Sequence, residues 1–383
     1  MTVVWSFPTR VVFGEQAAAE VGPEAIRLGA SKALIVTDPG VVDAGLADDV
    51  EKSLRRAKID FEVFAGISSN PKGDEARAAA DAFKKADADL VVAIGGGSVL
   101  DVGKLVRLLA SHPPPLAEYA ENIGGDAKIT EPMPPMLALP TTAGTGSEVG
   151  RSAVVTMEDT GKKTVFFHAD LIPDVAILDP ALTVTLPPRT TAATGFDALT
   201  HCIEAYCALG DHPMADAIAF AGIDLVAQHL PQAVEHGEDL EARGALLKAA
   251  MMGSVAFQKG LGACHSLAHP LSAEHGLHHG LANALCLPAV LDFNRSAVPD
   301  KIARIARRLR ARGDDTETLA FECSGSVRAL RRRVALPEGL AEAGVGEDAL
   351  PRLAALAFED PCHELNPRPC DKDDMLALYK ASL

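Results

Sequence analysis

A histidine-rich segment at 262–283 constrains this chain more than any other part of it, because it holds five of the twelve histidines. His265 and His269 are four residues apart, so on a helix both side chains lie on one face. The same spacing separates Asp197 from His201 in an apolar segment upstream. Two such pairs, together with a histidine on the following helix, could supply the several N or O ligands that a divalent cation needs.

Ordinary core packing is the alternative for each histidine taken alone, since a lone histidine on an apolar helix is usually hydrogen-bonded in the core. Five histidines within fifteen residues are different. Without a cation or a catalytic role, burying them would leave many polar nitrogens to satisfy. We expect His275 and His278 to be loop or pocket-rim residues. The predicted metal ligands are Asp197, His201, His265 and His279.

The length and charge of the chain limit its architecture and its partners. At 383 residues it is too long for one compact core, so two domains are expected, and its 48% of hydrophobic residues can fill them. The formal net charge of −16 argues against nucleic acid or an anionic membrane surface as a partner. Small molecules are the expected partners.

The cysteines and the N-terminus indicate a cytoplasmic protein. The seven cysteines are odd in number, scattered and without paired C-x-x-C spacing, as is typical of reduced thiols. Residues 1–8 show no basic region followed by an apolar one, and no apolar run reaches the roughly eighteen residues that a membrane helix requires. We therefore expect neither secretion nor a membrane span.

The first half of the chain alternates short apolar runs with amphipathic stretches. We expect strands at 33–37, 61–64 and 90–94, and helices at 43–57 and 73–86 between them. This βαβαβ order indicates an α/β domain with a parallel sheet.

A glycine-rich turn follows the last of these strands and opens a helix. It consists of Gly95, Gly96, Gly97 and Ser98. Glycines let backbone amides approach a pyrophosphate, whose charge is favoured by a helix N-terminus. An ordinary strand-to-helix turn that binds no ligand is the alternative, but the position of these glycines, between a strand and a helix, favours a phosphate site. A second turn, at 139–148, follows another apolar strand and offers small hydroxyls to a phosphate or a ribose.

Asp38 ends the first strand and is the candidate for selecting the dinucleotide. Its carboxylate can accept hydrogen bonds from a ribose diol and would repel a 2′-phosphate. A simple turn in Asp38-Pro39-Gly40 is the alternative. The order departs from the standard dinucleotide fingerprint, in which the glycine loop follows the first strand and the acid comes later.

Strand signals give way to helical patterns near residue 183. We place the domain boundary there, with an α/β domain at 1–183 and an all-helical domain at 184–383. The predicted metal ligands then lie in the second domain and the glycine loop in the first. Helices are expected at about 190–207, 213–230, 239–257, 263–272, 280–291, 297–312, 317–334 and 372–382.

Six motifs in the right order resemble those of the iron-dependent (group III) alcohol dehydrogenases, and the resemblance covers nearly the whole chain. It implies a Rossmann-like N-terminal domain with a parallel sheet and an all-helical C-terminal domain, as in the dehydroquinate synthases. The motifs are Gly-Gly-Gly-Ser-x-x-Asp-x-x-Lys at 95–104, Pro-Thr-Thr-Ala-Gly-Thr-Gly-Ser-Glu at 140–148, Gly-Phe-Asp-Ala-Leu-Thr-His at 195–201, His-x-x-x-His-Pro-Leu at 265–271, His-Gly-Leu-Ala-Asn at 279–283 and Asn-Pro-Arg at 366–368.

The resemblance also implies an NAD-dependent, metal-containing alcohol dehydrogenase or aldehyde reductase, acting on a small primary alcohol or an ω-hydroxy acid. Its cofactors would be NAD and a divalent metal, with Fe²⁺ expected and Zn²⁺ or Mn²⁺ as alternatives, and it would form a homodimer or a higher homo-oligomer. The four predicted ligands match the family's ligands, and His269 matches a nearby non-ligand in the proton relay. The residues expected to bind NAD are Asp38, Gly95, Gly96, Gly97, Ser98, Asp101, Thr141, Thr142, Thr145 and Lys163.

Three further residues are candidates for substrate contact. In this family the segment of Cys362 and His363 approaches the active site, although a structural cysteine and a surface histidine fit the sequence equally well. Arg151 directly follows the second cofactor turn, and its guanidinium could pair with a carboxylate of the substrate. An internal ion pair with Glu148 or another acid is the alternative for Arg151.

Other functions stay open on the sequence alone. A three-ligand zinc polyol dehydrogenase and a dehydroquinate synthase-like lyase would share the fold and the glycine loop, and a non-catalytic metal- or nucleotide-binding protein is a third alternative. The motifs at 265–271 and 279–283 favour the alcohol dehydrogenase branch. Stoichiometric formation of NADH from an alcohol would separate that branch from the lyase.

Overall fold

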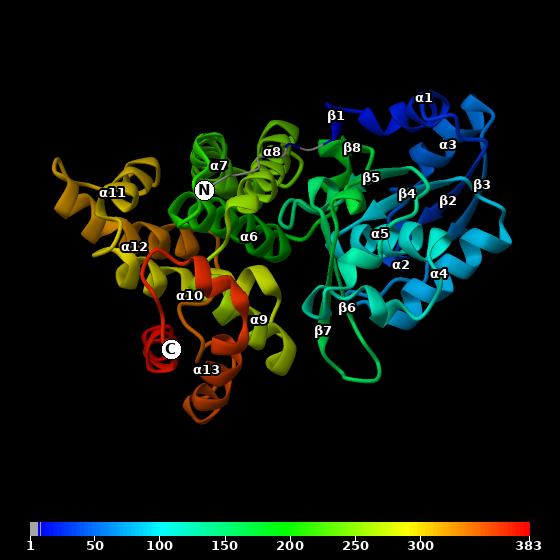
Figure 1. Cartoon of the computed structure of the whole chain (residues 1–383). Coiled ribbons are helices and arrows are strands. Elements are labelled where there is room, and N and C mark those ends of the chain that lie inside the picture. The colour runs from blue at the N-terminus through cyan, green and yellow to red at the C-terminus, as the bar shows by residue number, and fades with distance from the viewer. Residues whose placement is uncertain (1–6, 8) are drawn as a thin grey trace. The chain divides into compact units, whose positions relative to one another are not determined.

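The computed structural model describes residue 7 and residues 9–383 (Figure 1). Residues 1–6 and 8, in which we expected no secretion signal, lie outside the described residues. The chain forms two compact units, an α/β unit of residues 7–142 and 146–185 and a helical unit that includes 143–145 and 186–383. No helix in the described part of the chain is long and apolar enough to cross a membrane.

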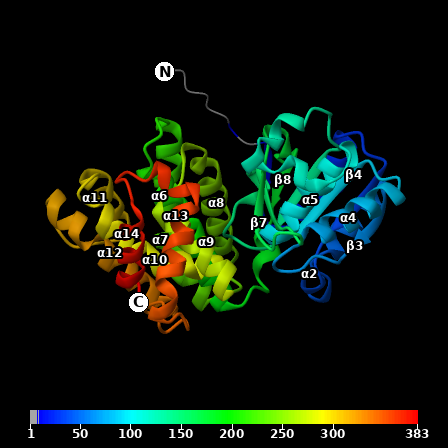
Figure 2. The same ribbon diagram turned by 60° about the horizontal axis from the view of Figure 1, so that its bottom comes forward.

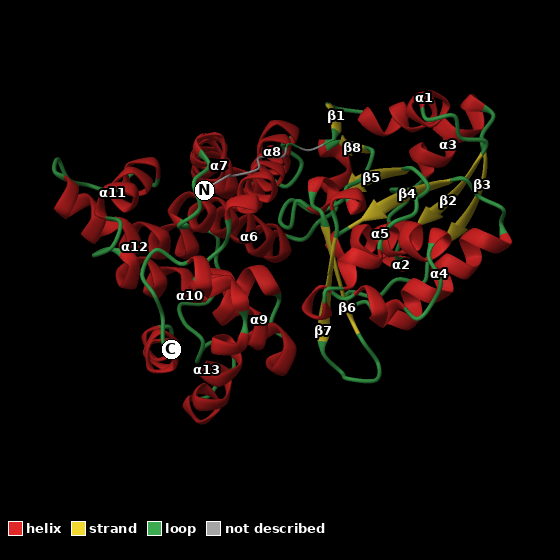
Figure 3. Cartoon of the chain, in the orientation of Figure 1, coloured by secondary structure: helices red, strands yellow, loops and turns green. Residues whose placement is uncertain are grey.

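A six-stranded parallel sheet forms the centre of the α/β unit, with the strand order β1-β8-β5-β4-β2-β3 (Figure 3). The inner strands are almost continuously buried and apolar, because helices cover both faces of the sheet. The strands are β1 (Arg10–Phe13), β2 (Lys32–Val36), β3 (Asp60–Phe64), β4 (Leu90–Gly95), β5 (Met136–Pro140) and β8 (Val175–Leu178).

Alternate residues of β2 pack into two separate cores, one on each face of the sheet. Leu34 faces the core that is covered by α4 (Gly73–Lys85) and α5 (Gly97–Ser111). Ile35 faces the core that is covered by α1 (Val21–Arg27) and α3 (Asp48–Ala57). The parallel sheet and its two helical layers confirm the predicted α/β architecture.

The helical unit is built around α6 (Pro188–Cys207), which is buried continuously from Thr191 to Cys207. Small and apolar residues let other helices pack around it, and α7, α8 and α10 do so (Figure 1 and Figure 2). The remaining helices are α7 (Pro213–Glu235), α8 (Leu240–Ala256), α9 (Ala263–His275), α10 (His279–Asn294), α11 (Pro299–Arg308), α12 (Thr316–Arg333), α13 (Leu350–Glu359) and α14 (Lys372–Ala381).

The turn between α9 and α10 sets the spacing of the histidines. Gly276 follows the last residue of α9 with a φ of 64°, a left-handed conformation that glycine adopts without strain. This cap ends α9, and α10 then begins at His279. His265 and His279 therefore come from two different helices.

Some elements were not predicted from the sequence. A two-stranded antiparallel hairpin joins β6 (Ser152–Thr156) to β7 (Lys163–Phe167), and α13 lies in a segment for which no helix was expected. The segment 43–57 was expected to form one helix. It instead contains the end of α2 (Pro39–Asp43), a turn and α3, because Gly45 adopts a φ of 69° and interrupts the helix.

Candidate metal centre and dinucleotide loops

Helix α6 positions the first two predicted ligands, Asp197 and His201. They lie one turn apart on the same face, and only 3% and 6% of their surfaces are exposed. The Nε2 atom of His201 is 4.0 Å from Oδ1 of Asp197. Burial of a carboxylate and an imidazole costs free energy unless both groups have hydrogen-bond or ionic partners. We therefore expect further polar groups next to this pair.

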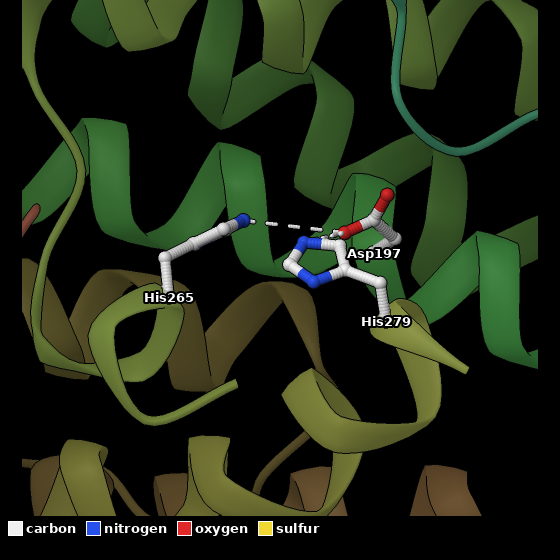
Figure 4. A group of neighbouring side chains, drawn as sticks. All are labelled: Asp197, His265 and His279. Atoms are coloured by element: carbon white, nitrogen blue, oxygen red, sulfur yellow. Dashed lines mark ion pairs between the residues drawn. The ribbon is translucent and has the colours of Figure 1, made fainter. Parts of the chain in front are cut away.

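Helices α9 and α10 bring His265 and His279 to the same carboxylate (Figure 4). Their Nε2 atoms lie 4.0 and 3.5 Å from Oδ1 of Asp197, and the ligand atoms of these three residues are all within 4.8 Å of one another. The His201 ring stacks on the His265 ring with centroids 4.6 Å apart. His201 lies outside this group of three but contacts two of its members, so the structure places all four predicted ligands near one another.

The donor set fits a divalent cation. Ligands about 2.1 Å from a tetrahedral centre are roughly 3.4 Å from one another, and the separations from Asp197 Oδ1 are 3.5 to 4.0 Å. One carboxylate and three imidazoles suit Fe²⁺, Zn²⁺ and Mn²⁺ alike. Their assignment as ligands stays a prediction.

The electrostatics of the cluster favour the ligating forms of two of its imidazoles. Burial lowers the pKa of His201 to about 4 and lowers the pKa of His279 well below its usual value. Burial alone would raise the pKa of Asp197, but the neighbouring histidines and a hydrogen bond from Asn283 lower it. Neutral imidazoles and an ionised carboxylate are the forms that bind metals.

Glu204 is a functional candidate that the sequence analysis missed. Its Oε2 lies 2.5 Å from Nδ1 of His265, and its Oε1 accepts a hydrogen bond of 2.7 Å from the backbone N–H of Cys264. Burial would lower the pKa of His265, but this contact with Glu204 raises it. The missed signal is the order Asp197-x3-His201-x2-Glu204, which places all three side chains on one face of α6.

Asn283 is a second residue whose role was not predicted. Its side chain is fully buried, and its Nδ2 donates a hydrogen bond of 2.9 Å to Oδ1 of Asp197. The residue lies one turn after His279 on α10. It therefore fixes the orientation of the carboxylate that the histidines share.

His269 lies beside this cluster and has a different partner. Its Nδ1 is 2.6 Å from Oδ2 of Asp360, and its ring stacks on that of His279 with centroids 5.2 Å apart. Oδ1 of Asp360 accepts hydrogen bonds from the hydroxyl of Ser266 and the backbone N–H of Cys362. Asp360 was not singled out in the sequence, because it is distant in the chain from the helix that it contacts.

The predicted substrate residues have structural partners of their own. Cys362 is half-buried beside Asp360, and the ring of His363 stacks on that of Phe358 with centroids 5.2 Å apart. The guanidinium of Arg151 lies over the ring of Phe167, 5.4 Å from its centroid. Arg151 forms no ion pair with any residue that the structure describes, so the alternative of an internal ion pair with Glu148 or another acid is not seen there.

The glycine turn has the geometry expected of a phosphate-binding loop. Strand β4 ends at Gly95, Gly96 is the N-cap, and α5 starts at Gly97. A Cβ atom on Gly95 would lie 2.5 Å from the side chain of Val99, so glycine is required there for packing. The first amides of α5 have no partner within the helix and are available to an anion. The Ser98 hydroxyl donates to the backbone of Ser69.

Asp38 and the glycine turn follow neighbouring parallel strands. Val36 of β2 pairs with Ala93 of β4, so Asp38 and Gly95 come from adjacent strand ends at one edge of the sheet. Dinucleotides bind at this edge in open α/β sheets. Asp38 is also the N-cap of α2, because its Oδ1 accepts a hydrogen bond of 3.0 Å from Val41.

The two cofactor turns are tied to each other inside the α/β unit. The backbone N–H of Thr141 donates a hydrogen bond of 2.9 Å to the carbonyl oxygen of Gly95, and the side chain of Thr142 lies against Gly96. Thr145 belongs to the helical unit, and Lys163 is the exposed first residue of β7. These placements leave their expected contacts with NAD as predictions.

The side chain of Asp101 belongs to a polar network that links α5 to the segment 147–154. Its carboxylate accepts hydrogen bonds from the Ser147 hydroxyl, at 2.6 Å, and from the backbone of Val154. Nζ of Lys104, which is fully buried, donates to the same hydroxyl and to the carbonyl oxygen of Ser152. Asp101 therefore holds the first cofactor turn to the second, and its direct contact with NAD stays a prediction.

The sequence profile of the iron-containing alcohol dehydrogenases matches residues 8–180, and the profile of the C-terminal region of the same family matches residues 191–383. The chain belongs to the iron-containing alcohol dehydrogenase family. The resemblance seen in the six motifs is thereby confirmed, together with the general class of enzyme.

Characterised relatives cover almost the whole chain. It is 39% identical to a 4-hydroxybutyrate dehydrogenase of Cupriavidus necator, over 94% of each chain. It is 38% identical to an NAD-dependent methanol dehydrogenase of Bacillus methanolicus, over 98% of each chain. A crystal structure of a 1,3-propanediol oxidoreductase is similar to this structure, with a TM-score of 0.96, 36% identity and coverage of 100% of both chains.

Proposed function

We propose that the protein is a metal- and NAD-dependent dehydrogenase that interconverts a small primary alcohol and its aldehyde. The observation that carries the proposal is the placement of the Nε2 atoms of His201, His265 and His279 within 4.0 Å of Oδ1 of Asp197 in the helical unit. Four ligands favour this function over that of a three-ligand polyol dehydrogenase. The glycine turn and Asp38, at one edge of the parallel sheet, support the use of a dinucleotide.

The residues around the cluster support this chemistry. When bound, a divalent cation polarises the oxygen of an alcohol or aldehyde, and NAD carries the hydride. Asp197 supplies one negative charge to the cation, and Asn283 holds that carboxylate in place. Because Nδ1 of His269 is engaged by Asp360, Nε2 is the atom of His269 that takes up the proton from the alcohol.

The decisive experiment is a panel of alcohols with protein that has been reconstituted anaerobically with iron. Stoichiometric NADH formation from an alcohol is the expected result. A lyase would recycle the dinucleotide and form no net NADH, and a binding protein would bind NADH without turnover. The odd number and scattered positions of the seven cysteines support a reducing, cytoplasmic location. The expected homo-oligomer can be measured by analytical ultracentrifugation.

Asp38 is expected to make the enzyme prefer NAD over NADP. Its carboxylate would repel the 2′-phosphate of NADP, and removal of the charge should raise the NADP to NAD ratio of kcat/KM about tenfold or more. Asp38→Asn is the sharper variant, because an asparagine Oδ1 can still accept the hydrogen bond from Val41 and cap α2. Asp38→Gly loses both the charge and the cap. An unchanged ratio in both variants would contradict the role of Asp38.

Arg151 is expected to favour substrates that carry a carboxylate. It has no acidic partner among the described residues, and the 4-hydroxybutyrate dehydrogenase among the relatives acts on such a substrate. A shielded Arg–carboxylate contact would contribute about 1.5–3 kcal/mol, or about ten- to a hundredfold in kcat/KM. Wild type should therefore prefer 4-hydroxybutyrate to 1-butanol, and Arg151→Met should lose that preference.

The control for this measurement is Arg56→Met, which removes an exposed arginine of α3 from the same unit. It should leave the ratio of the two kcat/KM values as in wild type. Equal use of both substrates by wild type, or an unaltered preference in Arg151→Met, would remove Arg151 from the substrate site. A neutral short-chain alcohol would then be the better substrate.

A further inference from the structure

Glu204 is surrounded by three hydrogen-bond donors in the core of the helical unit. They are the Nδ1 of His265 and the backbone N–H groups of Cys264 and His265, at 2.5, 2.7 and 3.3 Å. Only 4% of Glu204 is exposed. Both oxygens of an ionised carboxylate accept hydrogen bonds, so glutamate can satisfy all three donors. A neutral side chain such as an amide has one acceptor oxygen and cannot.

The contact with Glu204 determines which nitrogen of His265 can bind a metal. A neutral imidazole carries one proton, and the carboxylate places that proton on Nδ1. Nε2 is then left with a lone pair, and Nε2 is the atom that lies 4.0 Å from Oδ1 of Asp197 within the ligand cluster. Carboxylate–histidine–metal arrangements of this kind fix the ring and strengthen the ligand.

Glu204 also changes the charge around the cluster. A divalent cation with Asp197 as the one ionised ligand would have a net charge of +1, and the residues that would hold it are largely buried. The carboxylate of Glu204, one residue beyond the ligand shell, brings the sum to zero. A neutral sum lowers the cost of holding a cation away from water.

A neighbouring segment keeps Glu204 in place. Gly262 precedes α9, and a Cβ atom there would lie 2.7 Å from Oε1 of Glu204 and 2.9 Å from Oδ1 of Asn366. The same Oδ1 accepts hydrogen bonds from Ala263 and Asn294. The first turn of α9 is thus held by Glu204 and by the Asn-Pro-Arg motif together, and there is no room for a side chain at Gly262.

We propose that Glu204 is a positioning residue of the metal centre, which fixes His265 as an Nε2 ligand and supplies the second negative charge that makes the site bind a divalent cation tightly. The inference rests on the metal site of the proposed function. It assigns to Glu204 no contact with the substrate or with NAD.

Glu204→Gln is the informative variant, because the amide has the same shape but only one acceptor oxygen. If its NH2 group faces His265, the ring must carry its proton on Nε2, where the metal would bind. If its NH2 group faces Cys264, two buried donors oppose each other. We expect the dissociation constant for Zn²⁺, measured by competition with a chromophoric chelator, to rise about 10- to 100-fold. Glu204→Asp keeps the acceptor oxygens and should bind Zn²⁺ more tightly than Glu204→Gln.

Two further measurements make the test specific. Long-range ¹H–¹⁵N spectra of protein with ¹⁵N-labelled histidine should show His265 protonated on Nδ1 alone in wild type. In Glu204→Gln they should show a population protonated on Nε2, from the molecules in which the amide NH2 group faces the ring. The control is Glu235→Gln, which removes the same charge from the exposed end of α7 and should bind Zn²⁺ as wild type does. If Glu204→Gln does not fold, Gly262→Ala displaces Glu204 without removing its charge and should also weaken Zn²⁺ binding.

The possible results distinguish a failure of the role proposed for Glu204 from a failure of the metal site itself. Wild type that fails to bind one Zn²⁺ per chain would overturn the metal site, whatever Glu204 does. Wild type that binds Zn²⁺ with an affinity within threefold of that of folded Glu204→Gln would overturn the role of Glu204 alone. For a Glu204→Gln variant that does not fold, an unchanged affinity in Gly262→Ala would overturn it.

Discussion

Replacing His279 with alanine is expected to release the metal and to lower kcat/KM more than a hundredfold. Loss of a partner one shell away from a metal already costs about 10- to 100-fold in affinity or activity, and loss of a ligand should cost more. His279 Nε2 is the closest of the three imidazole nitrogens to Oδ1 of Asp197, at 3.5 Å. Elemental analysis of purified His279→Ala, with turnover measured beside it, checks the expectation, and His201→Ala should behave in the same way.

His269→Ala is the matched control for these ligand variants. It removes an imidazole from the same cluster of rings, but one whose Nδ1 contacts Asp360 and which groups with Asp360 and Cys362 rather than with Asp197. We expect this variant to keep its metal and to lose about 10²- to 10⁴-fold in kcat, the usual contribution of a proton-transfer residue. Full metal content in His279→Ala, or metal loss in His269→Ala, would contradict the assignment.

The fold could be predicted where the hydrophobic pattern has a single explanation. The apolar run of β4 is short and ends in glycines, as is typical of an inner strand, and the segment of α6 is long and rich in apolar residues at helical spacing, so both were predicted. The hairpin of β6 and β7 was not predicted, because its strands are short and half-exposed. Helix α13 was also not predicted, although its buried residues Leu350, Leu353, Ala354 and Ala357 follow a helical period, so this signal was present in the sequence and was missed.

The four-residue spacing in the sequence was enough to predict the ligand cluster. It did not predict the residues that hydrogen-bond to the cluster. A glutamate such as Glu204 on a helix is by default a solvated side chain, and its partner His265 is 61 positions away. Asp360 and His269 are 91 positions apart. Sequence periodicity reports which face of a helix is buried, whereas contacts of this range depend on how the helices pack.

Asp101 shows that a motif residue can have hydrogen-bond partners that the motif alone does not reveal. It was predicted as a cofactor contact because it belongs to the glycine-loop motif. In the structure its two oxygens accept hydrogen bonds from Ser147 and Val154, next to the buried Nζ of Lys104. The spacing Asp101-x2-Lys104 places both side chains on one face of α5, so their pairing is local, but the partner segment 147–154 is not.

Lys104→Met should destabilise the α/β unit by about 3–5 kcal/mol and weaken NADH binding. Methionine fills much of the same space, but it leaves the half-buried Asp101 carboxylate without its cation and the carbonyl of Ser152 without its donor. The second cofactor turn then loses its contacts with Lys104 and is held to α5 by Asp101 without that support. Urea unfolding followed by circular dichroism measures the first effect, and fluorescence titration with NADH measures the second. Lys84→Met on the exposed face of α4 is the control and should change neither. A loss below 1 kcal/mol in Lys104→Met would show that the network does not hold the two turns together.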